Sequence, residues 1–166
     1  MNIRTAVYPG SFDPVTLGHV DIIERSAKAF ERLVVLIVEN PDKKVSFSLE
    51  ERRALIEKVT AYMDNVSIDT HNGLLIDYLR SHDYRIIIKG LRAISDFDYE
   101  FQMALTNKKL AEEIETMFMM TRAEYAYLSS SVVKTIGPMG GDISGMVPAS
   151  IKEDILLRLT STKGEE

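Results

Sequence analysis

The chain has 166 residues and a mass of 18.7 kDa, the size of a single domain that can bury its own core. Its formal net charge of -5 argues against a protein that holds nucleic acid mainly by charge, although a small anionic ligand needs only a few local cations. It contains no cysteine, which excludes disulfides, thiolate metal sites and cysteine nucleophiles.

Short β-branched runs alternate with longer amphipathic stretches along the chain. Residues 1–5 contain no apolar signal core, and no later segment reaches the length of a membrane span, so we expect a cytoplasmic protein with no membrane or nucleic-acid partner. Strands are predicted over residues 5–8, 33–38, 66–70, 85–89 and 116–120. Helices are predicted over residues 19–30, 48–63, 74–81, 98–113, 130–136 and 149–159.

This alternation of strands and helices implies right-handed βαβ units and a parallel sheet. We expect an α/β fold with one doubly wound, Rossmann-like domain over residues 1–160, a five-stranded parallel sheet flanked by helices, and a flexible tail over residues 161–166. Such sheets bind ligands outside the carboxyl ends of their strands, where the strand order reverses. The chemically distinctive residues follow the first, fourth and fifth strands, which favours a nucleotide-sized site.

The first distinctive group is YPGSFDPVTLGH, residues 8–19, after the first strand. Gly10 and Gly18 allow close approach of the backbone to a ligand, and Thr16 can cap the following helix. His19 then lies in the first helical turn, where free N–H groups and the helix dipole favour a phosphate. A Gly-His pair alone is also compatible with a surface histidine, so the prediction of a phosphate site rests on the complete twelve-residue string.

The second group is KGLRAISDFDYE, residues 89–100. Lys89 and Arg92 flank a glycine at a strand end, which favours a phosphate cradle over a solvated basic pair. The acidic residues have no calcium-loop spacing, so capping and hydrogen bonding are the expected roles. The apolar positions of the following helix predict a buried stripe formed by Phe97, Phe101, Ala104 and Leu105.

The third group is YAYLSSSVVK, residues 125–134. Its three serines open a predicted helix and offer hydroxyl and N–H groups to an anion. Serine is also a common helix cap, and by itself this segment is better explained by capping.

Together these motifs resemble the nucleotidyltransferase superfamily, whose members carry H-x-G-H or T-x-G-H after the first strand and a later S-S/T-S/T-x-x-R/K motif. This chain has the threonine form at Thr16–His19, and Lys134 fills the later basic position. From residue 8 to about residue 148 it is similar to the phosphopantetheine adenylyltransferase family, most specifically in GLRA at 90–93 and DFDYE at 96–100. Lys89 departs from the arginine usual in that family, which keeps the charge but loses the bidentate fork.

The resemblance implies transfer of the adenylyl group of ATP to 4'-phosphopantetheine, giving dephospho-coenzyme A and pyrophosphate. The substrate phosphate would attack the α-phosphorus in line. His19 would stabilise the transition state, with Ser11 and Lys43 as further catalytic residues. The expected partners are the two substrates and two products, with coenzyme A as feedback inhibitor, and the expected assembly is a homohexamer. Mg²⁺ is expected on the ATP phosphates, without protein ligands.

The resemblance also assigns two sets of binding residues. The phosphopantetheine set is Ser11, Lys43, Leu75 and Lys89. The ATP set is Ser11, Phe12, His19, Gly90, Leu91, Arg92, Glu100, Tyr125, Ala126, Tyr127, Leu128, Ser129, Ser130 and Ser131.

Two alternatives belong to other classes of protein. One is a nicotinate or nicotinamide mononucleotide adenylyltransferase, which would share the string at residues 10–14 but normally has histidine at the place of Thr16. The other is a non-catalytic sensor of adenine nucleotide or coenzyme A. The presence of His19, Ser11 and both lysines argues against a sensor, because mere binding needs no transition-state contact.

Overall fold

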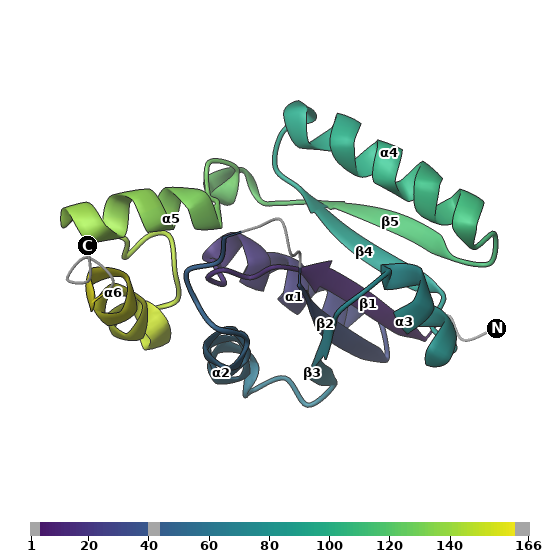
Figure 1. The fold of residues 1–166 in the computed structure, drawn as a ribbon, viewed down its shortest axis with the longest axis horizontal. Coiled ribbons are helices and arrows are strands. Elements are labelled where there is room, and N and C mark those ends of the chain that lie inside the picture. The colour runs from purple at the N-terminus through teal and green to yellow at the C-terminus, as the bar shows by residue number, and fades with distance from the viewer. Residues whose placement is uncertain (1–3, 40–43, 162–166) are drawn as a thin grey trace.

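The computed structural model describes residues 4–39 and 44–161. Five strands form one parallel sheet in the order β3-β2-β1-β4-β5 (Figure 1). The strands are β1 (Thr5–Gly10), β2 (Arg32–Val38), β3 (Val66–His71), β4 (Ile86–Leu91) and β5 (Glu115–Met120). The helices are α1 (Leu17–Ala29), α2 (Leu49–Thr60), α3 (Leu75–Ser81), α4 (Ile94–Leu110), α5 (Ser130–Ile136) and α6 (Lys152–Ser161). Three short 3₁₀ turns are η1 (Ala123–Tyr125), η2 (Gly137–Met139) and η3 (Ala149–Ile151).

The predicted α/β fold is confirmed, and the main differences lie at element ends. Helix α4 begins at Ile94 rather than at the predicted Asp98, because Ala93 is already extended and the helix starts directly after β4. Helix α6 is preceded by a 3₁₀ turn and continues through Ser161, the first residue of the expected flexible tail. Residues 162–166 lie outside the described residues, so the domain boundary stays a prediction.

The sheet packs against an apolar core on each face. Side chains alternate between the two faces of a strand, so a continuous apolar run such as that of β2 fills both cores. One core joins alternate residues of β2 to α1, α2, α5 and α6, and its members include Leu33, Val35, Ile37, Ile22, Ile56, Val133 and Ile155. The other joins the intervening residues to α3, and its members include Val34, Leu36, Ile76 and Leu79.

Helix α4 is the exception to this pattern, and its predicted buried stripe is wrong for the single chain. Phe97, Phe101 and Leu105 are exposed, because α4 covers only β4 and the edge strand β5 (Figure 1). The two phenylalanine rings stack on each other at 5.3 Å. Neither α4 nor any other helix in the described part of the chain is both long and apolar enough to cross a membrane.

Candidate active site

The strand order reverses between β1 and β4, since the chain passes outward to β2 and β3 on one side and to β5 on the other. Hydrogen bonds join the three distinctive sequence groups at this point. Arg92 Nη1, after β4, donates to the carbonyl of Leu128 at 2.6 Å. Ser130 Oγ, at the start of α5, donates to the carbonyl of Pro14 at 2.7 Å. The structure therefore brings together the three groups that the sequence separates.

His19 is held in one orientation by the cap of its own helix. Thr16 caps α1, and the His19 ring completes a reciprocal capping box because Nδ1 accepts from the Thr16 backbone N–H at 3.0 Å. With Nδ1 acting as acceptor, the neutral ring carries its proton on Nε2. Burial, and secondly the charge of Arg92, lower the pKa of His19 to about 4. At neutral pH the free site therefore offers an uncharged Nε2–H donor.

Phe12 packs edge-on against the His19 ring, with 5.1 Å between ring centroids, and likewise against Tyr8 at 5.4 Å. Its backbone is left-handed, with a φ of 48°, and its side chain is buried. The ring also covers Gly10, where an added Cβ would lie 2.9 Å from it, so this position requires glycine. The Phe12 ring thus packs against both Tyr8 and His19 and supports the orientation of His19.

Arg92 is fixed from two sides. Its Nε and Nη2 donate to the two carboxylate oxygens of Asp96 at 3.0 and 3.1 Å, while Nη1 holds the Leu128 carbonyl. The expected hydrogen-bonding role of Asp96 is therefore confirmed. This geometry holds the Arg92 cation between the first turn of α4 and the segment before α5, close enough to His19 to affect its pKa.

Lys89 and Glu100 form an ion pair, with Nζ 3.1 Å from Oε2. Lys89 lies in β4 and Glu100 in α4. The charge of Glu100 also contributes, after burial, to the raised pKa of Tyr8 in β1. The ion pair thus joins β4 to α4, beside β1, and connects two residues that the resemblance assigns to different substrates.

The three serines have different environments. Ser129 caps α5, because its Oγ accepts from the Val132 N–H at 3.1 Å. Ser130 is bonded to Pro14, whereas Ser131 is exposed. Lys134 donates to the buried carboxylate of Asp13 at 2.6 Å.

The remaining predicted residues differ in how the structure places them. Of the ATP set, Leu128 has a buried side chain and Tyr127 an exposed one. Leu75 opens α3 and packs against the core that includes Val7 of β1 and Val34 of β2. Lys43 lies outside the described residues, so its predicted role has no structural counterpart here.

Two buried charges to which the sequence assigned no role in the site fix its first loop. Arg52 is 2% exposed, and its Nη1 and Nε donate to the carbonyls of Ser11 at 3.0 Å and Ser48 at 3.3 Å. Its Nη2 lies 3.7 Å from Glu39. A signal was available, because Arg52 shares a helix face with the inward residues at 55, 56 and 59.

Asp13 is the second of these charges. Its carboxylate accepts from the backbone N–H of Ser46 at 3.1 Å and of Phe47 at 2.9 Å, besides the bond from Lys134. The loop after β1 is therefore fixed to the start of α2 and to α5. Among the described residues, no group of three or more histidine, aspartate and glutamate side chains is arranged to hold a metal ion.

Comparison with known proteins agrees with this arrangement. Residues 7–136 match the family model described as cytidylyltransferase-like. The phosphopantetheine adenylyltransferase of Clostridium tetani is 57% identical over 155 residues, covering 93% of this chain and 96% of the relative. That of Clostridium perfringens (strain 13 / Type A) is 50% identical over 163 residues, covering 98% and 99%. The structure of Plasmodium falciparum nicotinic acid mononucleotide adenylyltransferase, complexed with NaAD, superposes with a TM-score of 0.68 and covers 93% of this chain and 94% of that one. Its 14% identity shows a shared fold alone.

Proposed function

This chain belongs to the phosphopantetheine adenylyltransferase family, and we propose that it transfers the adenylyl group of ATP to 4'-phosphopantetheine. A phosphate oxygen of phosphopantetheine forms a bond to the α-phosphorus, and the bond from that phosphorus to the bridging oxygen breaks. The bridging oxygen leaves with the electron pair as pyrophosphate, and the other product is dephospho-coenzyme A. The observation that best supports this chemistry is the fixed, uncharged His19 beside Arg92 where the strand order reverses.

His19 donates its Nε2–H to an oxygen of the α-phosphate as negative charge develops there. The attacking phosphate is already anionic, so the reaction needs no strong general base, and catalysis comes from positioning and from charge stabilisation. Because Thr16 fixes the ring before substrates arrive, little reorganisation accompanies the reaction. Ser11, whose carbonyl is held by Arg52, lies in the loop between the two substrates and orients the nucleophile.

The two substrates occupy neighbouring parts of the crevice. Lys89 and Lys43 bind the phosphopantetheine phosphate, and Leu75 contacts the pantetheine arm. The N-terminal loop, the end of β4, Glu100 and the segment 125–131 surround ATP. The Lys89–Glu100 pair supports adjacent subsites, because it joins one residue from each set.

Magnesium is proposed to enter with ATP, held by phosphate oxygens and water. The carboxylates of Asp13, Asp96 and Glu100 each already contact a lysine or arginine of this chain, which suits a site that receives its divalent ion with the nucleotide. When bound, the ion neutralises charge on the phosphates.

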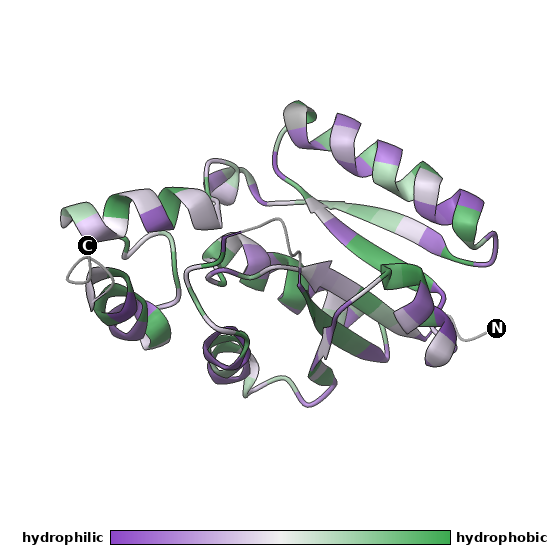
Figure 2. Cartoon of the chain, in the orientation of Figure 1, coloured by the Kyte–Doolittle hydropathy of each residue, from purple (hydrophilic) through white to green (hydrophobic). Residues whose placement is uncertain are grey.

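A homohexamer is the proposed assembly, in the cytoplasm. Exposed apolar side chains on α4 and the edge strand β5 support contact with further copies of the chain, and Figure 2 shows hydrophobic segments recurring along α4. Those side chains are Ile94, Phe97, Phe101, Met103, Leu105, Leu110, Met117 and Met120. Coenzyme A contains the pantetheine arm of the substrate, so we propose that it inhibits by occupying the same crevice.

The proposed activity is tested by pyrophosphate release from labelled ATP, with phosphopantetheine, with nicotinic acid mononucleotide and with neither. Release that depends on phosphopantetheine supports the proposal. Release with nicotinic acid mononucleotide alone would make the chain a pyridine nucleotide adenylyltransferase. Binding of ATP without turnover in any mixture would make it a sensor.

A further inference from the structure

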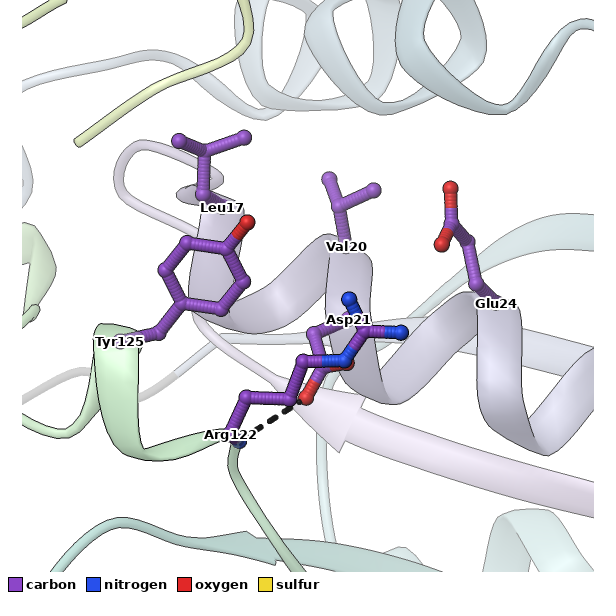
Figure 3. A pocket seen from close by; sticks show the side chains of 6 residues that line it. All are labelled: Leu17, Val20, Asp21, Glu24, Arg122 and Tyr125. Atoms are coloured by element: carbon purple, nitrogen blue, oxygen red, sulfur yellow. Dashed lines mark hydrogen bonds and ion pairs between the residues drawn. The ribbon is translucent and has the colours of Figure 1, made fainter. Parts of the chain in front are cut away.

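Asp21 is a buried carboxylate on α1, two residues after His19, with 2% of its side chain exposed. Its Oδ2 accepts from Arg25 Nη1 at 3.1 Å and from the backbone N–H of Arg122 at 3.2 Å. Its Oδ1 lies 2.9 Å from Arg122 Nε. Figure 3 shows Arg122 reaching from the segment after β5 to Asp21 on the helix.

These contacts hold a short segment of backbone against α1. Arg25 Nη1 also donates to the carbonyl of Met120 at 2.6 Å. Asp21 thus binds the backbone of Arg122 and Arg25 binds the backbone of Met120, so both residues that flank Thr121 are bonded to α1. At the start of α1, an added Cβ on Gly18 would lie 3.8 Å from the side chains of Thr121 and Tyr125. The segment 120–125 therefore packs along the first two turns of the helix that carries His19.

The segment held in this way leads directly into the residues expected to surround ATP. Tyr125 is the first of those residues, which continue to Ser131, and Arg92 holds the carbonyl of Leu128 within them. His19 is expected to act on the α-phosphate of the same ATP molecule. The position of segment 121–131 along α1 thus sets the distance between the nucleotide-binding residues and the Nε2–H donor.

We propose that Asp21 is a positioning residue that, through Arg25 and Arg122, fixes the nucleotide-binding segment 121–131 relative to His19. The contacts of the Asp21 carboxylate are with Arg25 and Arg122, so its proposed effect on catalysis is indirect. The inference rests on the proposed function, because it assigns the segment to ATP. A buried carboxylate that loses a cationic partner is costly, so the segment is expected to shift when Arg122 is replaced.

Arg122 is the better test site, because its side chain is 56% exposed and adjoins a hollow of about 90 Å³ lined also by Leu17, Val20 and Glu24 (Figure 3). Arg122→Gln breaks the side-chain pair and keeps the backbone N–H. Arg122→Lys keeps the charge. A matched control is Arg80→Gln, because Arg80 is 48% exposed and its Nε also lies 2.9 Å from a carboxylate, that of Glu113, away from the site.

Steady-state kinetics should show KM for ATP rising about tenfold in Arg122→Gln, because loss of the ion pair to a buried carboxylate is expected to shift the segment. KM for phosphopantetheine should stay within about twofold, and Arg122→Lys should recover most of the loss. In a double-mutant cycle with Asp21→Asn, the two effects on KM for ATP should be strongly non-additive. Arg80→Gln should match the wild type.

An unchanged KM for ATP in Arg122→Gln would overturn the inference, as would equal increases for both substrates together with a lower melting temperature. Calorimetric titration with ATP provides a readout without turnover. If the wild type releases no pyrophosphate, the proposed function fails. The positioning role of Asp21 is then judged on ATP affinity alone, where an unchanged affinity in Arg122→Gln would overturn it.

Discussion

Lys89 Nζ lies 3.1 Å from Oε2 of Glu100, and their side chains are only 26% and 21% exposed. The cation expected to receive the phosphopantetheine phosphate is thus already paired with a carboxylate from the expected ATP set. An incoming phosphate must therefore either share Lys89 with Glu100 or displace the Glu100 carboxylate from it.

Lys89→Ala is predicted to weaken phosphopantetheine binding by about 1.5–3 kcal/mol, the range for a hydrogen bond to a charged group, and to leave ATP binding nearly intact. Lys89→Arg restores a bidentate donor and should keep activity. Calorimetric titrations of both substrates check this. Loss of ATP binding with phosphopantetheine binding retained would reverse our division of the phosphate sites, and no change in either would make Lys89 a structural cation only.

His19→Ala is predicted to lower kcat roughly 10²–10³-fold, because it removes one preorganised donor to the transition state. ATP affinity should change much less. Stopped assays at saturating substrate, with calorimetry of ATP binding, separate these quantities. Near-normal turnover in this variant would remove His19 from the mechanism.

The pKa of His19 predicts a pH dependence of stability. Its value of about 4 in the folded chain lies below the ordinary 6.5, so the unfolded chain takes up a proton first as the pH falls. The contribution to stability is full above about pH 6.5 and is lost as the pH falls towards about 4. Urea unfolding of wild type and His19→Gln across this window should show a steeper loss in the wild type. An NMR titration of His19 with a midpoint near 6.5 would contradict the prediction.

Arg52→Met is predicted to lower the free energy of unfolding by about 3 kcal/mol, because it leaves the carbonyl of Ser11 without its buried donor and removes the bond to the carbonyl of Ser48. The substitution should also weaken the binding of both ATP and phosphopantetheine, since Ser11 is proposed to lie between them. The neighbouring Arg53→Met is the control, because Arg53 is 46% exposed and its surface pair with Glu57 is worth about 0–1 kcal/mol. Equal unfolding free energies for the two variants would show that the buried arginine has no special role.

The sequence predicted those features that arise from local patterns. The apolar run of β2 indicated a strand buried on both faces, and Thr16 was correctly identified as a helix cap. The contacts that orient the site depend on tertiary structure. Asp13 accepts from residues 33 and 34 positions away, and the left-handed Phe12 is held by rings on both sides. Periodicity also identified the apolar stripe of α4, but periodicity does not say what covers such a stripe, and in the single chain it stays exposed.

Adenylyl transfer to phosphopantetheine is tested most simply by pyrophosphate release from ATP by the purified wild-type chain, measured with and without 4'-phosphopantetheine and with magnesium present. We predict release only when both substrates are present, with dephospho-coenzyme A formed in equal amount. Release without phosphopantetheine, or no release with both substrates although ATP binds, would contradict the proposed function.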